Sequence, residues 1–419
     1  MTATSIRAPA ALAPHPLICR LCGTDHGPRP IAICEECLGP LEPRPPAPVR
    51  YPDRATIAAR PRTLWRYREW LPFDGAPVHS LDVGGTPLVA APRLAERLGV
   101  GRVWVKHDGV SSPSCSFKDR VVATALNAAH AFGLDTVGCA STGNLANAVA
   151  AQAAAAGLSA WILIPEELET AKLVATAVFG PRVVRIQGHY DDVNRLCARI
   201  ADRYGWGIVN VNLRGYYGEG SKTMAFEIVE QLGWRLPTPV VAPMAGGSLV
   251  TRLRKGFAEF TSAGLASGPE PRVFGAQAAG CAPIVRLVER GGDAIEPVVP
   301  RTLAHSIAIG NPADGLFARQ ALVESGGWAA AVTDAEIVGG MRVLAEAPGI
   351  FTGTAGGATV AAAGALARAG RLGPRDEVVL CITGNGLKTT EALGGALAPA
   401  PVIRPRLQDF QTLVEGVTP

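Results

Sequence analysis

From Val83 onward, short runs rich in β-branched residues alternate with stretches rich in alanine and leucine. The runs include "RVWVKHD", "AWILIP", "PVVAP" and "EVVLCIT", and each stands beside a segment of helical composition. This alternation predicts an α/β fold built on parallel sheets with helices on both faces. Ligands of such folds bind where strands end and helices begin, so we expect the chemistry to lie in strand-to-helix turns.

The length of 419 residues predicts two or three domains, each with its own core. We expect a disordered start, a cysteine-bearing segment, a proline-rich linker with a helical arm, two α/β regions and a tail. The expected ranges are 1–15, 16–45, 46–80, 81–235, 236–395 and 396–419. The arm carries Trp65, Tyr67 and Trp70, which suit either contact with another subunit or packing on the chain's own domain.

The charge balance narrows the classes of partner. Forty basic and 36 acidic side chains leave a net charge of +4, too small and too dispersed to indicate a nucleic-acid partner. We find neither a secretory leader nor a run of apolar residues long enough for a membrane span, so we expect a cytosolic protein. Nine cysteines, an odd count, favour free thiols and a metal site over a disulfide framework.

Four cysteines form the pattern C-x2-C-x11-C-x2-C at Cys19, Cys22, Cys34 and Cys37. Two such pairs can close a tetrahedral thiolate shell around one zinc ion. Because sulfur would fill all four positions, no site would remain for water, and the zinc would be structural. Buried cysteines without metal are the alternative, and a redox role is weaker because neither pair lies in a βαβ context.

Only six of the 40 basic residues are lysines. Among them, Lys118 has the sequence surroundings that best favour a neutral amine. In "SPSCSFKDR" it follows a turn and opens the helix "FKDRVVATALNAAHAFG". A helix N-terminus and partial burial beside Phe117 both disfavour the ammonium form. A neutral amine is what a Schiff base with a carbonyl cofactor requires. An ordinary surface lysine beside Asp119 and Arg120 is the alternative.

Three later turns have the composition of ligand-binding loops. In "CASTGNLANAVAAQ" the turn 141–144 presents small hydroxyls and free backbone N–H groups to an anion such as a carboxylate. In "VVAPMAGGSLVTRL" the loop 245–249 precedes a helix and suits a phosphate dianion. In "VVLCITGNGLK" Thr383 ends a buried strand, where its hydroxyl can meet a ring nitrogen that stays unprotonated. Each loop alone is equally compatible with close packing.

Together these segments resemble the fold-type II pyridoxal-phosphate enzymes, a group that includes the tryptophan synthase β-like proteins, and within it the threonine synthase family. The motifs that carry the resemblance span residues 83 to 390. They are "GGTPLV", "SFKDR", "GCASTGNLANAVAAQAAAAG", "EGSKTMAFEIVEQLGW", "GGSLVTRLRKGF", "SIAIGNPADG" and "TGNGLK". The resemblance implies two doubly wound parallel or mixed sheet domains behind a small four-cysteine zinc ribbon, and relatives of this kind are often homodimers.

The resemblance also implies a role for each matching position. Lys118 would bond the cofactor aldehyde and carry protons. Asn144 would hydrogen-bond the cofactor's 3′-oxygen, and Thr383 would face the pyridine nitrogen. The cofactor phosphate would be bound by Ala245, Gly246, Gly247, Ser248 and Leu249. The amino-acid substrate would be bound by Ser141, Thr142 and Gly143 at its carboxylate, and by Lys222 and Arg214 at its phosphate.

The activity that the resemblance implies is conversion of O-phospho-L-homoserine and water into L-threonine and phosphate. Several positions depart from the family pattern: Cys115 stands where a glycine is usual, Asn385 replaces a frequent histidine, and extra residues follow Arg214. These departures lie on the substrate side. Two alternatives therefore stay open: a related enzyme that performs β-replacement or elimination on another amino acid such as phosphoserine, and a non-catalytic protein that binds a partner through the ribbon.

Overall fold

The computed structural model describes residues 12–46, 49–141, 143–166, 169–188 and 190–416. Its larger sheet has six strands in the order β13-β12-β11-β14-β6-β5. All neighbouring strands in it run parallel except β5, which is antiparallel to β6. The strands are β5 (Leu88–Ala90), β6 (Arg102–His107), β11 (Pro239–Pro243), β12 (Arg272–Ala278), β13 (Ala329–Val332) and β14 (Glu377–Ile382).

The second sheet has four parallel strands in the order β10-β7-β8-β9. They are β7 (Thr136–Ala140), β8 (Ser159–Pro165), β9 (Arg182–Ile186) and β10 (Gly207–Ile208). The β-branched runs of the sequence form these strands because both faces of each sheet are covered by helices. The α/β class with parallel and mixed sheets, expected from the alternating pattern, is confirmed.

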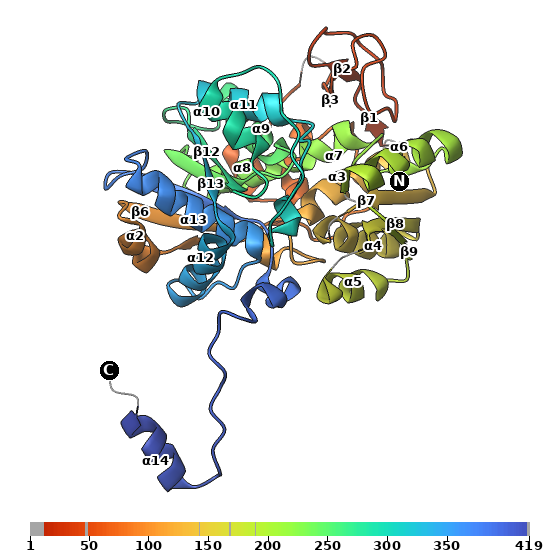
Figure 1. Cartoon of the computed structure of the whole chain (residues 1–419). Helices are drawn as coiled ribbons and strands as arrows, with labels where there is room; N and C mark the ends of the chain where they lie inside the picture. The colour runs from red at the N-terminus through yellow and green to blue at the C-terminus, as the bar shows by residue number, and fades with distance from the viewer. Residues whose placement is uncertain (1–11, 47–48, 142, 167–168, 189, 417–419) are drawn as a thin grey trace, which may run out of the picture.

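Helices cover both sheets, and Figure 1 shows α13 and α12 on the larger sheet and α4 and α5 beside the smaller one. Alanine-rich α3, α4 and α13 are largely buried because small side chains permit close packing against the strands. The α-helices are α1 (Arg54–Ala58), α2 (Pro92–Leu98), α3 (Lys118–Ala131), α4 (Asn144–Ala156), α5 (Thr170–Ala177), α6 (Tyr190–Tyr204), α7 (Arg214–Gly220), α8 (Lys222–Gln231), α9 (Ser248–Ser262), α10 (Pro283–Arg290), α11 (Gly315–Glu324), α12 (Asp334–Glu346), α13 (Thr354–Arg368) and α14 (Leu407–Gly416). The 3-10 helices are η1 (Leu64–Trp70), η2 (Asp108–Val110), η3 (His305–Ile307), η4 (Gly386–Lys388) and η5 (Thr390–Leu393).

The two sheets do not follow the division of the sequence at residues 235 and 236. Strands β5 and β6 precede that point, yet both belong to the larger sheet with β11 and β14. Strand β6 pairs with β14 from Arg102↔Glu377 to His107↔Ile382. The carboxyl ends of these two strands therefore meet at one edge, which brings Thr383 next to the turn that leads into α3.

The described part of the chain begins at residue 12, inside the stretch 1–15 that was expected to be disordered. Strand β1 (Ala13–Pro14) pairs with β4 (Phe73–Asp74), and the backbone N–H of buried His15 donates to Pro72 O at 3.0 Å. These backbone bonds hold a stretch that its composition suggested was loose, which corrects that expectation for residues 13–15. Residues 1–11 of the same stretch lie outside the described residues.

The expected helical arm is a short helix, α1, followed by the 3-10 helix η1, and it packs on the chain's own core. Tyr67 and Trp70 are buried, and both rings contact Phe226 and Phe260 within 6 Å between centroids. Burial of large aromatic rings favours this packing over an exposed arm. The sequence left two interpretations open, and in the structure the arm packs on the chain's own domain.

At the other end of the chain, α14 stands away from the body (Figure 1). Of the helices in the described ranges, none is both apolar enough and long enough to cross a lipid bilayer.

Candidate active site

The turn that carries Lys118 is bonded to the turn that follows β14. Helix α3 begins at Lys118, and the N–H of the preceding Phe117 donates to Thr383 O at 2.9 Å. Ser116 and Gly384 also form an antiparallel bridge. Two motifs more than 260 residues apart in the sequence thus form one local structure, with Lys118 and Thr383 side by side.

Lys118 lies in surroundings that favour a neutral amine. Its Nζ donates to Tyr217 Oη at 3.2 Å, and the Phe117 ring centroid lies 5.6 Å from Nζ. Burial lowers the pKa of Lys118 to about 8, because the charged form loses solvation. Burial also raises the pKa of Tyr217, so its hydroxyl stays protonated at neutral pH. At pH 7 about one in ten Lys118 side chains is therefore an uncharged nucleophile, far more than for an ordinary lysine.

A cavity of about 220 Å³ opens in front of this lysine. Most of the residues expected around the cofactor and substrate line it together. From the expected cofactor set these are Lys118, Asn144, Ala245, Gly246, Gly247, Ser248, Leu249 and Thr383, and from the expected substrate set Ser141 and Arg214. Thr142 lies outside the described residues.

The loop before α9 has the shape of a phosphate cradle. Gly247 has φ +92°, and a side chain there would lie 2.9 Å from Ala318 Cβ, so only glycine fits. A Cβ at Gly246 would have only Ile309 nearby, at 4.0 Å, and would project into the cavity. The first turn of α9 leaves backbone N–H groups without helical partners. Together with Ser248 Oγ these donors suit a phosphate dianion.

The polar side chains of Thr383 and Asn144, which line the cavity, also fit the ring of a planar cofactor. Within the described ranges, Thr383 Oγ1 has no hydrogen-bond partner, although its side chain lines the cavity. The Asn144 amide is oriented from one side, because Lys388 Nζ donates to Asn144 Oδ1 at 3.3 Å. That contact leaves the amide nitrogen of Asn144, a donor, for a phenolic oxygen. The residues present thus match the groups of pyridoxal phosphate.

The turn after β7 leads into α4, and the hydroxyl of Ser141 in this turn is hydrogen-bonded to the turn's own backbone. Ser141 Oγ accepts hydrogen bonds from the N–H groups of Gly143, at 3.0 Å, and Ala146, at 2.8 Å. Gly143 has φ +125°, and a side chain there would lie 2.1 Å from Cδ of Lys172. Gly143 itself does not line the cavity. The turn is therefore packed tightly, with the Lys172 side chain lying over it.

The two residues expected at the substrate phosphate lie in different places. Arg214 opens α7 and lines the cavity, and its Nη2 lies 2.7 Å from Asp314 Oδ2. Lys222 is buried and does not line the cavity; its Nζ lies 2.6 Å from Glu219 Oε2 and 2.9 Å from Glu259 Oε1. Contrary to the sequence-based expectation, Lys222 belongs to an internal ion network, because α8 turns its first residue toward α9.

Sequence reasoning missed three polar residues of this site: Tyr217, Lys388 and Arg20. Tyr217 in "RGYYGEG" had the pattern of a core tyrosine, and Lys388 that of a surface lysine. Burial also lowers the pKa of Lys388 to about 8. Arg20 lines the cavity although it lies in the cysteine-bearing segment, far from the α/β regions in sequence. Tyr217 and Arg20 line the cavity, and Lys388 acts on it through its hydrogen bond to Asn144. No local pattern could have identified these residues, since their places depend on the fold.

Comparison with known proteins identifies the family. The sequence model described as "Pyridoxal-phosphate dependent enzyme" matches residues 79–384. The chain belongs to this family. A threonine synthase of Methanosarcina acetivorans is 35% identical over 387 residues, which cover 90% of this chain and 93% of the relative. The threonine synthase of Methanocaldococcus jannaschii is 37% identical, with coverage of 78% and 81%, and that of a Synechocystis strain is 40% identical, with coverage of 77% and 82%.

Solved structures of pyridoxal-phosphate enzymes share the fold. Diaminopropionate ammonia lyase from Escherichia coli superposes with a TM-score of 0.64 at 21% identity, covering 74% of this chain and 86% of that one. Threonine deaminase isoform 2 from Solanum lycopersicum gives a TM-score of 0.61 at 21% identity, with coverage of 74% and 83%. The resemblance to fold-type II enzymes, predicted from the motifs, is confirmed.

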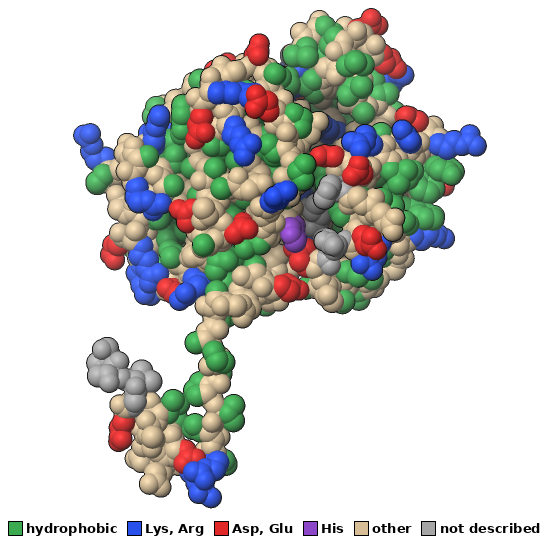
Figure 2. All heavy atoms as spheres, in the orientation of Figure 1, with side chains coloured by type: hydrophobic (Ala, Val, Ile, Leu, Met, Phe, Trp, Pro, Cys, Tyr) green, Lys and Arg blue, Asp and Glu red, His purple; other side chains and the backbone are tan. Residues whose placement is uncertain are grey.

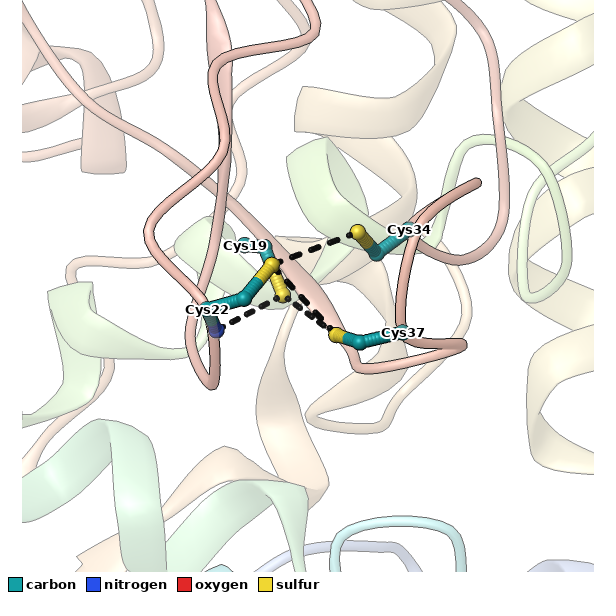
Figure 3. Close-up of side chains that lie close together, drawn as sticks. All are labelled: Cys19, Cys22, Cys34 and Cys37. Atoms are coloured by element: carbon teal, nitrogen blue, oxygen red, sulfur yellow. Dashed lines mark hydrogen bonds between the residues drawn. The ribbon is translucent and has the colours of Figure 1, made fainter.

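The side chains of the four cysteines lie close together in the N-terminal segment (Figure 3). Their sulfur atoms all lie within 4.8 Å of one another, and the Sγ–Sγ distances Cys19–Cys37 and Cys22–Cys34 are 3.4 and 3.6 Å. A tetrahedral zinc with bonds of ~2.3 Å separates its sulfurs by about 3.8 Å. The cluster therefore has the donor set and size of a four-cysteine metal site.

Proposed function

We propose that this protein is a threonine synthase, which converts O-phospho-L-homoserine and water into L-threonine and phosphate. The observation that carries the proposal is the convergence of Lys118, Asn144, Thr383 and the loop before α9 on one cavity, in a chain whose threonine synthase relatives match most of its length. We also propose that the four-cysteine cluster binds one structural zinc ion.

The chain's own residues account for cofactor binding. Lys118 would bond the aldehyde carbon, the loop from Ala245 to Leu249 would bind the phosphate, and Asn144 and Thr383 would bind the ring oxygen and the ring nitrogen. Pyridoxal phosphate supplies an electron sink for a carbanion at the substrate's Cα. A threonine hydroxyl, unlike a carboxylate, does not hold the ring nitrogen protonated.

Lys118 is also the base that the reaction needs. Phosphate leaves from Cγ after protons are removed at Cα and Cβ; Cγ then gains a proton to become the methyl group, and water adds its hydroxyl at Cβ as Cα regains a proton. A single amine close to these carbons can remove the protons at Cα and Cβ and deliver protons to Cγ and Cα, a contribution of about 10²- to 10⁴-fold. The Tyr217 hydroxyl orients this amine between transfers, since it lies 3.2 Å from Nζ and stays protonated.

The turn after β7 and the start of α7 would bind the substrate. Backbone N–H groups at the N-terminus of α4, with Ser141 and Thr142, suit the amino-acid carboxylate. Arg214 at the opening of α7 suits the phosphate, because a guanidinium makes charge-assisted bonds to a dianion. Asp314 holds the Arg214 guanidinium at the cavity wall.

One observation favours the second candidate, a related enzyme that acts on another phosphorylated amino acid. Cys115, in the turn that leads to Lys118, has φ +55°, a conformation typical of the glycine that the family usually has there. The exposed Cys115 side chain stands three positions before Lys118, where a glycine would carry none. This difference in the turn that carries the lysine favours a different phosphorylated substrate, such as phosphoserine.

A substrate comparison on the yellow holoenzyme tests the proposal. We expect phosphate release from O-phospho-L-homoserine with L-threonine formed in equal amount. Release from phosphoserine with a nucleophile, and none from O-phospho-L-homoserine, would replace it by the second candidate. A purified protein that takes up no pyridoxal phosphate would contradict both.

A further inference from the structure

We propose that Arg20, which lies in the four-cysteine segment (residues 16–45), binds the anionic side-chain group of the substrate. This inference rests on the proposed function, because it assigns the substrate of that same cavity to the class of amino acids with a phosphorylated side chain. It makes the four-cysteine segment a part of the active site as well as a metal-binding module.

The four-cysteine segment forms one wall of the cavity that contains Lys118. In Figure 1 strands β2 (Leu17–Cys19) and β3 (Leu41–Pro43) stand above α7 and the start of the α/β body. Figure 2 shows the same segment as a lobe on top of the molecule, with a hollow below it. The segment's cavity-lining residues are Arg20, Ala32, Pro40 and Leu41. Of these, only Arg20 carries a charge.

Arg20 is held in position without using its donors. Its backbone N–H donates to Pro40 O at 3.0 Å, next to the metal-ligand candidate Cys19. Its guanidinium carbon lies 3.7 Å from the centroid of the Phe317 ring on α11. Stacking on an aromatic face fixes the plane of a guanidinium but leaves its N–H edges free. The arginine is thus oriented before any ligand binds.

Two neighbouring arginines are paired more closely with carboxylates than Arg20 is. Arg214 pairs with Asp314 at 2.7 Å, and Arg252 pairs with both Glu219 and Glu42. Arg20 forms a looser ion pair with Glu42: its Nε lies 3.7 Å from Glu42 Oε2, beyond hydrogen-bond distance.

Across the described ranges, no acceptor bonds the Arg20 guanidinium. Arg20 is therefore the cavity-lining cation with free capacity for an anion. A phosphate dianion offers the paired oxygens that a guanidinium fork accepts.

The substrate is a better ligand for Arg20 than the cofactor is. The cofactor phosphate already has a complete cradle at the start of α9, with Gly246, Gly247 and Ser248. The family match spans residues 79–384, which contain the residues expected at the cofactor, and Arg20 lies outside that range. Arg20 lies outside the segment that binds the cofactor. Such a residue suits the substrate, because the substrate varies among these enzymes and the cofactor does not.

The side chain of Arg20 lines a second cavity as well. Arg20 and Arg252 line this cavity of about 680 Å³, together with residues of α9 and α11. A shorter side chain at position 20 would change the shape of both cavities. For this reason the test needs a variant that keeps the length and charge of Arg20 as well as one that removes the charge.

Ligand binding to the holoenzyme tests the inference independently of turnover. Binding of O-phospho-L-homoserine, O-phospho-L-serine and unphosphorylated L-homoserine is followed through the change in the cofactor's visible absorbance. We expect Arg20→Gln to weaken binding of both phosphorylated amino acids about tenfold or more, and to change L-homoserine binding less than twofold. Arg20→Lys should have an intermediate effect, because it keeps the charge but loses the fork.

The matched control is Arg29→Gln in the same segment, since Arg29 is about half exposed and pairs with Glu35 away from the cavity. It should bind all three amino acids as the wild type does. Metal content and cofactor affinity are measured for every variant. If Arg20→Gln loses metal, the inference is tested on Arg20→Lys alone, whose affinity for the phosphorylated amino acids should be lower than that of the wild type.

Three outcomes would overturn the inference: unchanged affinity for phosphorylated amino acids, an equal loss for L-homoserine, or weakened pyridoxal-phosphate binding in place of weakened substrate binding. The proposed function fails separately, if wild-type enzyme binds O-phospho-L-homoserine but forms no threonine.

Discussion

The Lys118 amine and the Tyr217 hydroxyl meet where α3 packs against α7, with Nζ donating to Oη at 3.2 Å. The two residues are 99 positions apart in the chain. Tyr217 is the described residue that hydrogen-bonds the proposed catalytic amine, so it governs where that amine points. The neighbouring Tyr216 points elsewhere, and its hydroxyl donates to His15 O at 2.9 Å.

This pair of tyrosines provides a matched comparison. We expect Tyr217→Phe to lower kcat about tenfold with little loss of stability, because it removes a hydrogen bond of roughly 1 kcal/mol that orients Lys118. Tyr216→Phe should leave kcat unchanged and lower the free energy of unfolding by about 1 kcal/mol. Steady-state kinetics and urea unfolding measure both. Equal loss of activity in the two variants would contradict the orienting role of Tyr217.

Replacement of Lys118 should abolish catalysis. Lys118→Ala removes both the covalent link to the cofactor and the proton carrier, so we expect activity to fall at least ~10³-fold, at the upper end of the range for proton transfer. Borohydride reduction of wild-type protein followed by peptide mapping should place the cofactor on Lys118. Labelling of Lys388, whose pKa is also lowered, would show that the other amine is the reactive one.

Cofactor uptake by the apoprotein should depend on pH through Lys118. Its pKa is about 8, below the ordinary lysine value of ~10.4, so the neutral fraction at pH 7 is about one in ten and rises with pH. We expect the rate of uptake to increase between about pH 6.5 and about 9 and then to level off. Stopped-flow absorbance at constant ionic strength measures it. A rate that still rises about tenfold per unit above about pH 9 would indicate an ordinary lysine.

Lys222 should matter for stability and not for substrate binding. Its buried ammonium neutralises Glu219 and Glu259; burial alone would lower its pKa, but the two carboxylates outweigh burial and raise it, so Lys222 remains charged. We expect Lys222→Gln to lower the free energy of unfolding by about 3 kcal/mol, since it removes a buried cation that pairs closely with both carboxylates. KM for the amino-acid substrate should change less than twofold. A large rise in KM with normal stability would restore the role in substrate binding that the sequence suggested.

Metal analysis should find about one zinc ion per chain. Cys37→Ser removes one of four thiolates, so we expect zinc content to fall severalfold and unfolding to begin at lower temperature. Cys115→Ser is the control, because Cys115 is also exposed but lies outside the cluster. Zinc content well below one ion in wild-type protein, with all four cluster thiols titratable, would contradict the structural site.

The amino-acid sequence by itself determined the α/β class and the family. It also predicted Lys118, the loop at residues 245–249 and Thr383, which line one cavity, and the four cysteines, which lie together. Each of these depends on a short segment, because a strand, a turn and the start of a helix are consecutive in the chain and leave a local pattern. The convergence of these segments on one cavity, and the ordered strand at residues 13–14, became visible only in the fold.

Only the tertiary structure decided the positions of Tyr217, Lys222 and Arg20. Tyr217 and Arg20 have unremarkable local patterns, and Lys222 stands in a motif that suggested a different place. The positions of all three depend on distant partners: Lys118 for Tyr217, Glu259 for Lys222, and Phe317 for Arg20. Burial and charge pairing are properties of the whole packed chain, since desolvation depends on everything that surrounds a side chain and not on its neighbours in sequence.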